Sequence, residues 1–385
     1  MKIAVIGAKG LPAKQGGIEH HCQELYSRIV EQGHSVDLFA RSSYTESLHR
    51  YDIQGIRVFP LPSIKFKGVD ALLCSALAGV ASSRMHYDIV HFHALGPALF
   101  SWLPKFTSAK VVVTCHGLDW QRAKWSKASS QLLQLGEKTA VSCADRLVVV
   151  SEDLRSYFRQ TYGRETTYIP NAPAKLAESD PNFLYGTSLG LKQKCYILFL
   201  GRLVPEKRPD LLIKAFQAAK LPGWKLVLAG GVSDTNQFVL ELVDIAAKST
   251  DIIFPGELHG NRLAEIVRGA GLFVLPSELE GLPLAMLEAM QEGVPVLASD
   301  IPPHQQLLAE ERGILFQTGN LDSCIDNLKW AIRNFQKLSA MVKDAKSYIQ
   351  ANYNWSYVTT ETLRLYSSLC TSSNTFDPEF NVQTD

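Results

Sequence analysis

Short runs of Val, Ile and Leu recur along the chain, and stretches with helical periodicity separate them. Runs of this kind indicate strands buried on both faces, and their alternation with helices is typical of a parallel sheet. The pattern therefore predicts an α/β protein with two series of strands, which means two doubly wound domains. The predicted strands are residues 2–6, 35–40, 88–93, 110–114 and 146–150 in the first half, and 195–200, 225–229, 251–254, 272–275 and 295–298 in the second.

Residues 169–190 contain three prolines and no clear period, so we place the linker there. We therefore expect a first domain over residues 1–185 and a second over 186–354. The residues after Asp322 have a helical pattern, which ends in a helix over 356–369. The last residues, 371–385, are polar and net acidic, and we expect a frayed tail there.

Composition narrows the class of protein. The 385 residues are 46% hydrophobic and 20% charged, which is typical of a folded chain, and the net charge of +1 gives no reason to expect a nucleic-acid partner. Seven cysteines without a C-x-x-C pair indicate a reducing compartment. The chain opens on a strand pattern instead of a signal peptide, and its longest apolar stretch is too short to cross a bilayer. We expect a cytoplasmic protein that at most lies on a membrane surface.

A glycine-rich segment, residues 7–17, follows the first predicted strand and leads into a helical pattern. Such a turn lets backbone N–H groups approach a phosphate at a helix N-terminus. Its spacing is neither G-x-G-x-x-G nor a P-loop, and the second strand is followed by Arg41 where an NAD site needs an acidic residue. An NAD-dependent oxidoreductase is therefore disfavoured, and for this loop in isolation a purely geometric turn is the simpler interpretation.

Two cations follow the first strand of the second half. Arg202 comes at the strand end and Lys207 at the start of the next helix, in GRLVPEKRPD. Because open parallel sheets bind ligands beyond the carboxyl ends of their strands, these side chains suit a diphosphate. A surface basic cluster is the alternative, and it fits Arg208 well.

The segment PSELEGLPLAMLEAM, residues 276–290, combines a loop after a strand with the start of a helix. Glu280 lies in the loop, Pro283 suits the first helical turn, and Glu288 lies inside the helix. Free amides at such a helix start form a phosphate seat, while two carboxylates can accept hydrogen bonds from sugar and ribose hydroxyls. Isolated glutamates are more often solvated, but the apolar residues around Glu288 argue against that for this one.

The pairing of GRLVPEKRPD with the E-x7-E motif of EGLPLAMLE resembles the retaining glycosyltransferases of family 4, which have the GT-B fold. The segments IGAKGLPAKQGGIE and HGLDWQRAKW resemble a bacterial branch of rhamnosyl- and glucosyltransferases of cell-surface polysaccharide assembly. The resemblance extends through Leu369. It implies two Rossmann-like domains that face a cleft, an acceptor-side domain followed by a donor domain, with a last helix over 355–370 that packs back on the first.

The resemblance also implies roles for individual residues. Arg202 and Lys207 match the pair that binds the donor diphosphate, and Glu288 matches the glutamate that takes the ribose hydroxyls. Glu280 matches the glutamate beside the donor sugar, and His116 matches the histidine that faces the C6 side of that sugar. Glu280, His116 and the two cations are the expected catalytic residues.

Further positions follow from the same resemblance. Gly16 and Gly17 match the loop near the diphosphate and the acceptor. Leu258 lies where family members contact the nucleotide base, largely through backbone groups. The amides of Leu282 and Leu284 complete the phosphate seat, although the proline between them has no N–H.

For several polar residues the sequence allows both a functional and a structural role. Glu19 and Asp119 suit the acceptor side or a helix cap. His91 and His93 share one face of a strand, which fits a metal site or packing; we favour packing because no third ligand accompanies them in the sequence. His21 follows the glycine loop without a metal partner. Since the chain also lacks the Asp-x-Asp pair of the other glycosyltransferase architecture, we expect no metal and no cofactor.

These observations predict transfer of a hexose, with UDP-glucose as the favoured donor, to a hydroxyl of a growing glycan in envelope or exopolysaccharide synthesis. The resemblance implies retention, with the departing diphosphate as base. A GT-B sugar-nucleotide epimerase and a non-catalytic sugar-nucleotide binding protein remain as alternatives. Aromatic and basic residues over 100–106 and 64–67 suit peripheral contact with an anionic membrane that carries lipid-linked glycans, although helix packing also explains the first.

Overall fold

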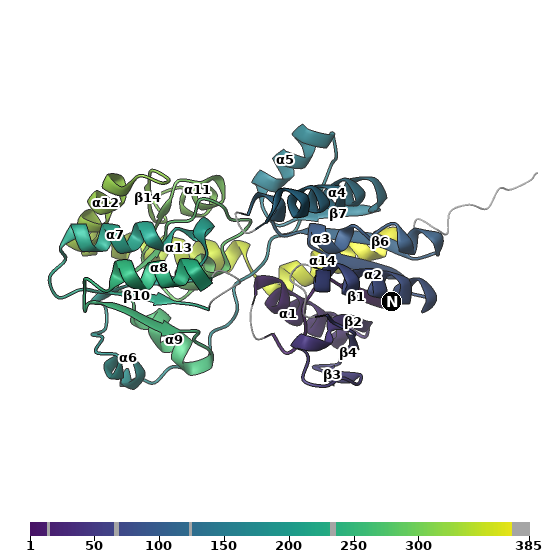
Figure 1. Ribbon diagram of the computed structural model, residues 1–385, viewed down its shortest axis with the longest axis horizontal. Helices are drawn as coiled ribbons and strands as arrows, with labels where there is room; N and C mark the ends of the chain where they lie inside the picture. Colours follow the sequence, from purple (N-terminus) through teal and green to yellow (C-terminus); the bar gives the residue numbers. More distant parts are fainter. Residues whose placement is uncertain (14–15, 65–68, 123–124, 232–235, 372–385) are drawn as a thin grey trace, which may run out of the picture. The chain divides into compact units, whose positions relative to one another are not determined.

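The computed structural model describes residues 1–13, 16–64, 69–122, 125–231 and 236–371 (Figure 1). Residues 372–385 of the tail expected to be frayed lie outside the described residues, and so do residues 65–67 of the aromatic and basic segment 64–67. The chain divides into two compact units. Among the described residues, unit 1 holds those of 1–120, 127–170 and 355–371, and unit 2 holds those of 121–126 and 171–354.

Unit 1 is built on an eight-stranded sheet with the order β3-β4-β2-β1-β5-β6-β7-β8. Its pairs are parallel except for β3 with β4, which is antiparallel. The central strands are almost fully buried, as the continuous apolar runs predict. The strands are β1 (Lys2–Ile6), β2 (Ser35–Arg41), β3 (Tyr51–Ile53), β4 (Ile56–Leu61), β5 (Ile89–His93), β6 (Lys110–Cys115), β7 (Arg146–Val149) and β8 (Thr167–Tyr168).

Unit 2 is built on a parallel six-stranded sheet with the order β11-β10-β9-β12-β13-β14. Its core is one continuous hydrophobic cluster that includes both faces of this sheet. The strands are β9 (Tyr196–Leu200), β10 (Lys225–Ala229), β11 (Ile252–Gly256), β12 (Leu272–Leu275), β13 (Val296–Ser299) and β14 (Ile314–Phe316).

Helices connect most successive strands in both units (Figure 1). In unit 1 they are α1 (Gly17–Glu31), α2 (Val69–Arg84), α3 (Leu95–Ala98), α4 (Lys127–Cys143), α5 (Glu152–Tyr162) and α14 (Trp355–Thr371), with short 3₁₀ turns η1 (Ser42–Tyr44) and η2 (Leu103–Phe106). The 3₁₀ turn η3 (Asp119–Gln121) begins in unit 1, and its last residue belongs to unit 2. In unit 2 they are α6 (Leu184–Ser188), α7 (Pro209–Ala219), α8 (Asn236–Ala246), α9 (Gly260–Gly269), α10 (Leu284–Gln291), α11 (Pro302–Leu308), α12 (Leu321–Arg333) and α13 (Phe335–Asn352), with the 3₁₀ turn η4 (Pro205–Lys207).

The prediction of two doubly wound parallel sheets is confirmed, and every strand expected from the sequence is present within two residues at each end. The sequence pattern missed β3, β4, β8 and β14, which are short or lie toward the sheet edges. In β4 the apolar run is broken by Arg57 and Pro60. The proline is tolerated because β3 pairs only as far as Val58, so Pro60 has no neighbour on that side.

The division between the units differs from the expected boundary after residue 185. The structure assigns residues 171–185 to unit 2. Phe183 stacks on Tyr196 of β9 with ring centroids 6.2 Å apart, and the amide of Gly186 donates to buried Glu265 at 2.8 Å. This segment is therefore packed on the sheet that follows it, which its proline content does not reveal.

The order of strands fixes where ligands can bind. In unit 1 the chain runs outward in opposite directions from β1 and β5, and in unit 2 it does so from β9 and β12. The carboxyl ends of these strand pairs are the topological switch points where open parallel sheets bind ligands. Gly7 begins the loop after β1, and its φ is +120°. A Cβ there would lie 2.2 Å from the carbonyl oxygen of His93, so only glycine allows this close approach to β5.

Candidate active site

A buried ion pair joins the two loops at the switch point of unit 2. Lys207 ends η4 after β9, and Glu280 lies in the loop after β12. Lys207 Nζ is 2.5 Å from Glu280 Oε1, and the Ser277 hydroxyl donates to the same oxygen at 2.8 Å. Burial raises the pKa of Glu280, but the charge and hydrogen bond of Lys207 outweigh it and hold the pKa below its usual value. The structure thus brings together Lys207, expected at the donor diphosphate, and Glu280, expected beside the donor sugar.

A chain of hydrogen bonds from Ser299 and His304 holds Ser277, the residue that donates to Glu280. Ser299 Oγ donates to the carbonyl of Ser277 at 2.5 Å, and His304 Nδ1 lies 2.9 Å from the carbonyl of Ser299. His304 is fully buried, and burial lowers its pKa to about 4, so it is neutral near pH 7. The sequence analysis assigned no role to these residues. Ser277 follows β12 within the segment 276–290, whereas Ser299 ends β13 and His304 lies in α11, outside any motif.

Glu288 lies inside α10, as predicted, eight residues after Glu280. Its pKa is raised to about 7: burial raises it most, a hydrogen bond from the backbone of Ala174 lowers it, and the nearby charge of Glu292 raises it. Near neutrality this carboxyl is thus partly protonated. A carboxyl held in this state can exchange hydrogen bonds with hydroxyl groups of a ligand.

The other residues expected at the nucleotide site are Leu258, Leu282 and Leu284, of which the last two flank Pro283 at the start of α10. Pro283 precedes α10, and its carbonyl accepts from the amides of Met286 and Leu287 at 3.0 and 3.1 Å. Leu282 and Leu284 pack against the core of unit 2, as does the buried Leu258. Their side chains are therefore structural, so any contact they make with a nucleotide must come from their backbone.

Arg202 follows β9 directly after Gly201 and is half-buried. The loop that carries it approaches the loop after β10 very closely, because a Cβ at Gly230 would lie 1.8 Å from the carbonyl oxygen of Gly201. Arg202 is therefore held at the switch point by backbone packing, on the same strand end as Lys207.

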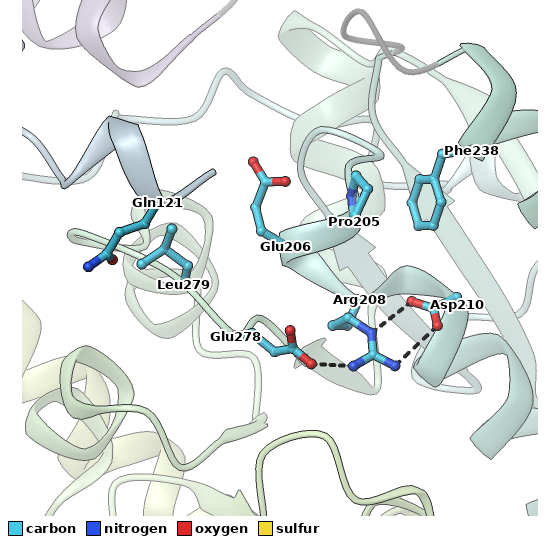
Figure 2. Close-up of a pocket in the computed structure, with 8 residues that line it drawn as sticks. All are labelled: Gln121, Pro205, Glu206, Arg208, Asp210, Phe238, Glu278 and Leu279. Carbon is cyan, nitrogen blue, oxygen red and sulfur yellow. Dashed lines mark hydrogen bonds and ion pairs between the residues drawn. The ribbon is translucent and has the colours of Figure 1, made fainter. Parts of the chain in front are cut away.

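A cavity of about 590 Å³ opens in unit 2 beside these residues (Figure 2). Arg208 crosses it, with its Nε 3.1 Å from Asp210 and its Nη1 paired with Glu278, so the expected surface cation is held by two carboxylates. The amide of Glu278 donates to the carbonyl of Glu206 at 2.8 Å, which ties the loop after β12 to η4. The cavity is lined by Gln121, Pro205, Glu206, Arg208, Asp210, Phe238, Glu278 and Leu279.

In unit 1 the glycine loop is closed by Glu19. Gly16 precedes α1 with φ +96°, and Gly17 is the first residue of that helix. Glu19 Oε1 accepts the backbone N–H of Lys9 at 2.9 Å, and a Cβ at Gly16 would lie 2.1 Å from Glu19 Oε2. Glu19 is not a helix cap, because α1 has no side-chain cap hydrogen bond; its carboxylate instead fastens the loop backbone at Lys9 to the helix start. The loop residues 14–15 lie outside the described part of the chain.

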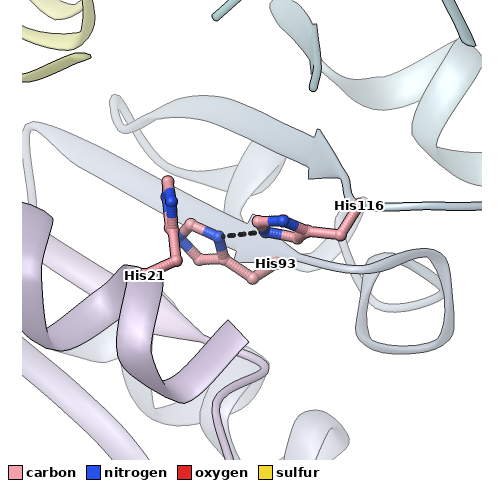
Figure 3. A group of neighbouring side chains, drawn as sticks. All are labelled: His21, His93 and His116. Carbon is pink, nitrogen blue, oxygen red and sulfur yellow. Dashed lines mark hydrogen bonds between the residues drawn. The ribbon is translucent and has the colours of Figure 1, made fainter. Parts of the chain in front are cut away.

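His116 follows β6 and belongs to a histidine cluster at the ends of β5 and β6. His91 and His93 stack with ring centroids 4.3 Å apart, and His93 Nδ1 lies 3.0 Å from His116 Nε2. The hydroxyl of Tyr26 lies 2.9 Å from His91 Nδ1 and 2.7 Å from His93 Nε2. Burial lowers the pKa of His91 and of His116 to about 3, so both are neutral. His21 of α1 completes the cluster (Figure 3).

The loop after His116 carries Asp119 and Trp120 in η3. Trp120 Nε1 donates to the buried carboxylate of Glu137 at 2.8 Å, and the hydroxyls of Tyr157 and Tyr162 donate to its other oxygen at 2.7 and 2.6 Å. Glu137 thus fixes the segment that carries Asp119, although its sequence context shows no motif.

Two family models cover most of the chain. Residues 15–172 match the model described as Glycosyltransferase Family 4, and residues 188–348 match the model described as Glycosyl transferases group 1. The chain is a GT-B glycosyltransferase of the family 4 and group 1 type. The second match contains Arg202, Lys207, Glu280 and Glu288.

Relatives of this glycosyltransferase match it along nearly its whole length. D-inositol 3-phosphate glycosyltransferase from Gordonia bronchialis is 25% identical, over 98% of this chain and 91% of the relative. The protein of the same name from Rhodococcus erythropolis is 24% identical, over 97% and 92%.

Solved structures of similar shape confirm the GT-B fold. Sucrose-phosphate synthase from Thermosynechococcus elongatus superposes with a TM-score of 0.83 at 22% identity, over 96% of this chain and 99% of that one. Anabaena HepE, solved in complex with UDP and glucose, gives 0.80 at 19% identity, over 96% and 100%.

Proposed function

We propose that this glycosyltransferase moves a hexosyl unit, with retention, from a nucleoside diphosphate sugar to a hydroxyl of a growing envelope or exopolysaccharide glycan. UDP-glucose is the favoured donor, since HepE was solved with UDP and with UDP-glucose. The observation that carries the proposal is the Lys207–Glu280 pair at the switch point of unit 2.

The chemistry follows from the charges that develop. As the bond between the anomeric carbon and the diphosphate breaks, negative charge grows on the leaving group, which Arg202 and Lys207 stabilise. Glu280 holds Lys207 in place and accepts hydrogen bonds from the sugar, and Glu288 accepts the ribose hydroxyls. We assign His116 to the transferred sugar. The acceptor oxygen bonds to the anomeric carbon and gives its proton to the departing phosphate oxygen, so the step requires no protein base and no metal.

The acceptor is tested by offering several donors to several acceptors. UDP-, GDP-, ADP- and dTDP-linked hexoses are incubated with lipid-linked glycans, and NMR of the product gives the anomeric configuration. We expect transfer from UDP-glucose with retention. Conversion of the donor without any acceptor would instead support an epimerase, and binding without turnover would support a non-catalytic sugar-nucleotide binding protein.

The relatives favour a second acceptor class. Their name includes a phosphorylated inositol, and sucrose-phosphate synthase also carries a phosphorylated sugar in its name. Inositol 3-phosphate and a hexose phosphate therefore belong in the same panel. Faster transfer to either of them than to a glycan would replace the glycan acceptor in this proposal.

Membrane contact is supported by an exposed apolar patch on unit 1. Phe106 is 81% exposed and Trp102 44%, with their rings edge to face at 5.9 Å, and Leu77 and Val80 are exposed on α2, which packs against η2. Lys105 between the aromatics pairs with Asp145 at 2.7 Å, so its charge is partly neutralised. No helix of the described residues is long and apolar enough to cross a membrane.

We propose that this patch binds the surface of a membrane. Flotation with anionic vesicles tests it: the wild-type protein should float, and a Trp102→Ser, Phe106→Ser double variant should not. Wild-type protein that stays entirely in the soluble fraction would refute the contact. Equal flotation of the double variant would show that the protein contacts the membrane through another surface.

A further inference from the structure

Three imidazoles meet in unit 1 from three different elements (Figure 3). His21 comes from α1, His93 ends β5, and His116 follows β6. One ring nitrogen of each lies within 4.8 Å of the other two. The ring centroids are 5.1 to 5.4 Å apart. No other group of this kind, with three or more potential ligands from His, Cys, Asp or Glu, is present among the described residues.

The spacing is close to that of a zinc site. With Zn–N bonds of about 2.0–2.1 Å and tetrahedral angles, ligand nitrogens lie roughly 3.3 Å apart. His93 Nδ1 and His116 Nε2 are already 3.0 Å apart, and the third nitrogen, at most 4.8 Å from the others, is within roughly 1.5 Å of the tetrahedral separation. The hydrogen bond between His93 and His116 uses one proton, which must leave Nδ1 or Nε2 before both nitrogens face a metal.

The Tyr26 hydroxyl can accept a hydrogen bond from a proton on the Nε2 atom of His93. Its Nε2 lies 2.7 Å from the hydroxyl of Tyr26, so the tautomer with the proton on Nε2 leaves Nδ1 free to bind. Tyr26 in turn lies 2.9 Å from His91 Nδ1, whose other nitrogen is 2.7 Å from Thr114 Oγ1. Metal-binding histidines usually have such a partner on the second ring nitrogen, which fixes ring orientation.

The cluster is also buried and fixed by the sheet. His93 is fully buried and His21 is 4% exposed, and His93 pairs in register with Thr114 across β5 and β6. Neutral imidazole suits Zn²⁺, Cu²⁺ and Ni²⁺, whereas Mg²⁺ prefers oxygen ligands.

We propose that His21, His93 and His116 bind one Zn²⁺ ion and leave a fourth coordination position open. The ion is a ligand of this protein and not a reactant in the transfer step proposed above. Because His116 is also the residue assigned to the transferred sugar, zinc would withdraw it from that role. The site itself rests on geometry alone and stands whether or not the proposed transfer is correct.

Direct binding tests the site without measuring transfer. The full-length protein is treated with a chelator, freed of it, and titrated with Zn²⁺ by calorimetry and with Co²⁺ by visible absorption. We expect one ion per chain, a Co²⁺ spectrum of low coordination number that zinc abolishes, and no competition by Mg²⁺. A wild-type protein that takes up neither ion would overturn the proposal.

Variants locate the ion. His21→Gln should weaken zinc binding at least tenfold, and Tyr26→Phe should weaken it by roughly tenfold through the second shell. His20→Gln is the matched control, since His20 is the exposed neighbour on the same helix. Thermal unfolding shows that each variant is folded, and zinc should raise the melting temperature of wild type but not of His21→Gln. Undiminished binding by His21→Gln, or equal loss in His20→Gln, would place the ion elsewhere and refute the site.

Discussion

The ammonium group of Lys207 lies 2.5 Å from the carboxylate of Glu280, and the two side chains come from loops that follow different strands of one sheet. Both are largely buried, with 15% and 11% of their side-chain surface exposed. A pair this well shielded holds the Lys207 side chain in a fixed position before any ligand arrives. A diphosphate that binds there replaces part of an existing electrostatic environment and requires little rearrangement of the protein.

Replacing Lys207 should therefore abolish transfer. We expect Lys207→Ala to lower kcat/KM at least tenfold, because loss of a charged partner for the leaving group costs about 2–4 kcal/mol. Lys214→Ala, on the exposed face of α7, is the matched control and should behave as wild type. Steady-state kinetics with the donor identified above measures both. Full activity of Lys207→Ala would show that the diphosphate lies elsewhere.

Glu288 predicts how nucleotide binding depends on pH. Its pKa of about 7 means that the carboxyl is ionised above neutrality and protonated below it. Since the carboxylate accepts two hydroxyl hydrogen bonds more readily than the acid does, affinity for UDP should fall as the pH is lowered from 8 to 6.

Calorimetry of UDP binding at several pH values measures this effect. Glu288→Gln should bind more weakly at pH 8 and should lose the part of the pH dependence that belongs to this carboxyl. The diphosphate titrates in both proteins and so cancels in the comparison. Identical pH profiles for the two proteins would remove Glu288 from the nucleotide site.

The pattern of apolar runs was sufficient to predict both sheets, because buried parallel strands require continuous hydrophobic sequence. Lys207, Glu280 and Glu288 were found because they follow strands and belong to a recognisable motif. His304 and Glu137 were not, since the partners that make them important lie 5 to 25 residues away and on other elements.

The histidine cluster shows the same limit in another way. His91 and His93 were correctly placed on one face of a strand, but the sequence offers no spacing that connects them with His21 or His116. These histidines lie 95 residues apart along the chain at the extremes and meet because β5 lies between β1 and β6. Only the strand order brings them together, and strand order is not encoded in any local pattern.

Comparing Gly16 with Gly33 separates the cost of backbone strain from the cost of a steric clash. Both glycines have a positive φ, but a Cβ at Gly16 would also clash with Glu19 Oε2, whereas a Cβ at Gly33 would meet open space. Gly33→Ala should cost about 1–2 kcal/mol of unfolding free energy from backbone strain alone. Gly16→Ala should cost more and should also lower transfer, because Glu19 must release the backbone of Lys9. Denaturant unfolding and kinetics of both variants test this; equal costs would mean that the contact with Glu19 is unimportant.

Glu137 should be a strong contributor to the stability of unit 1. Its carboxylate accepts from Trp120, Tyr157 and Tyr162, and it is buried. Glu137→Gln removes the charge and places an amide donor against hydroxyl donors, so we expect a loss of about 2–3 kcal/mol in denaturant unfolding. Glu165→Gln, an exposed carboxylate 3.5 Å from Arg159, should change stability by less than about 0.5 kcal/mol. A Glu137→Gln protein as stable as the control would mean that water satisfies these donors.

The metal proposals combine into one kinetic prediction. If the transfer step needs no metal, EDTA should leave the rate of the purified enzyme unchanged or raise it by removing bound zinc. Added Zn²⁺ should inhibit wild type, because it occupies His116, and Mg²⁺ should not. Inhibition is expressed as a fraction of each protein's own metal-free rate, so that the basal effect of a substitution does not enter.

His21→Gln should need at least tenfold more zinc for half inhibition, while His20→Gln should match wild type. Loss of activity in EDTA that Mg²⁺ restores would show that the reaction depends on a metal after all, and equal inhibition of His21→Gln would show that zinc acts at a different place from the three histidines.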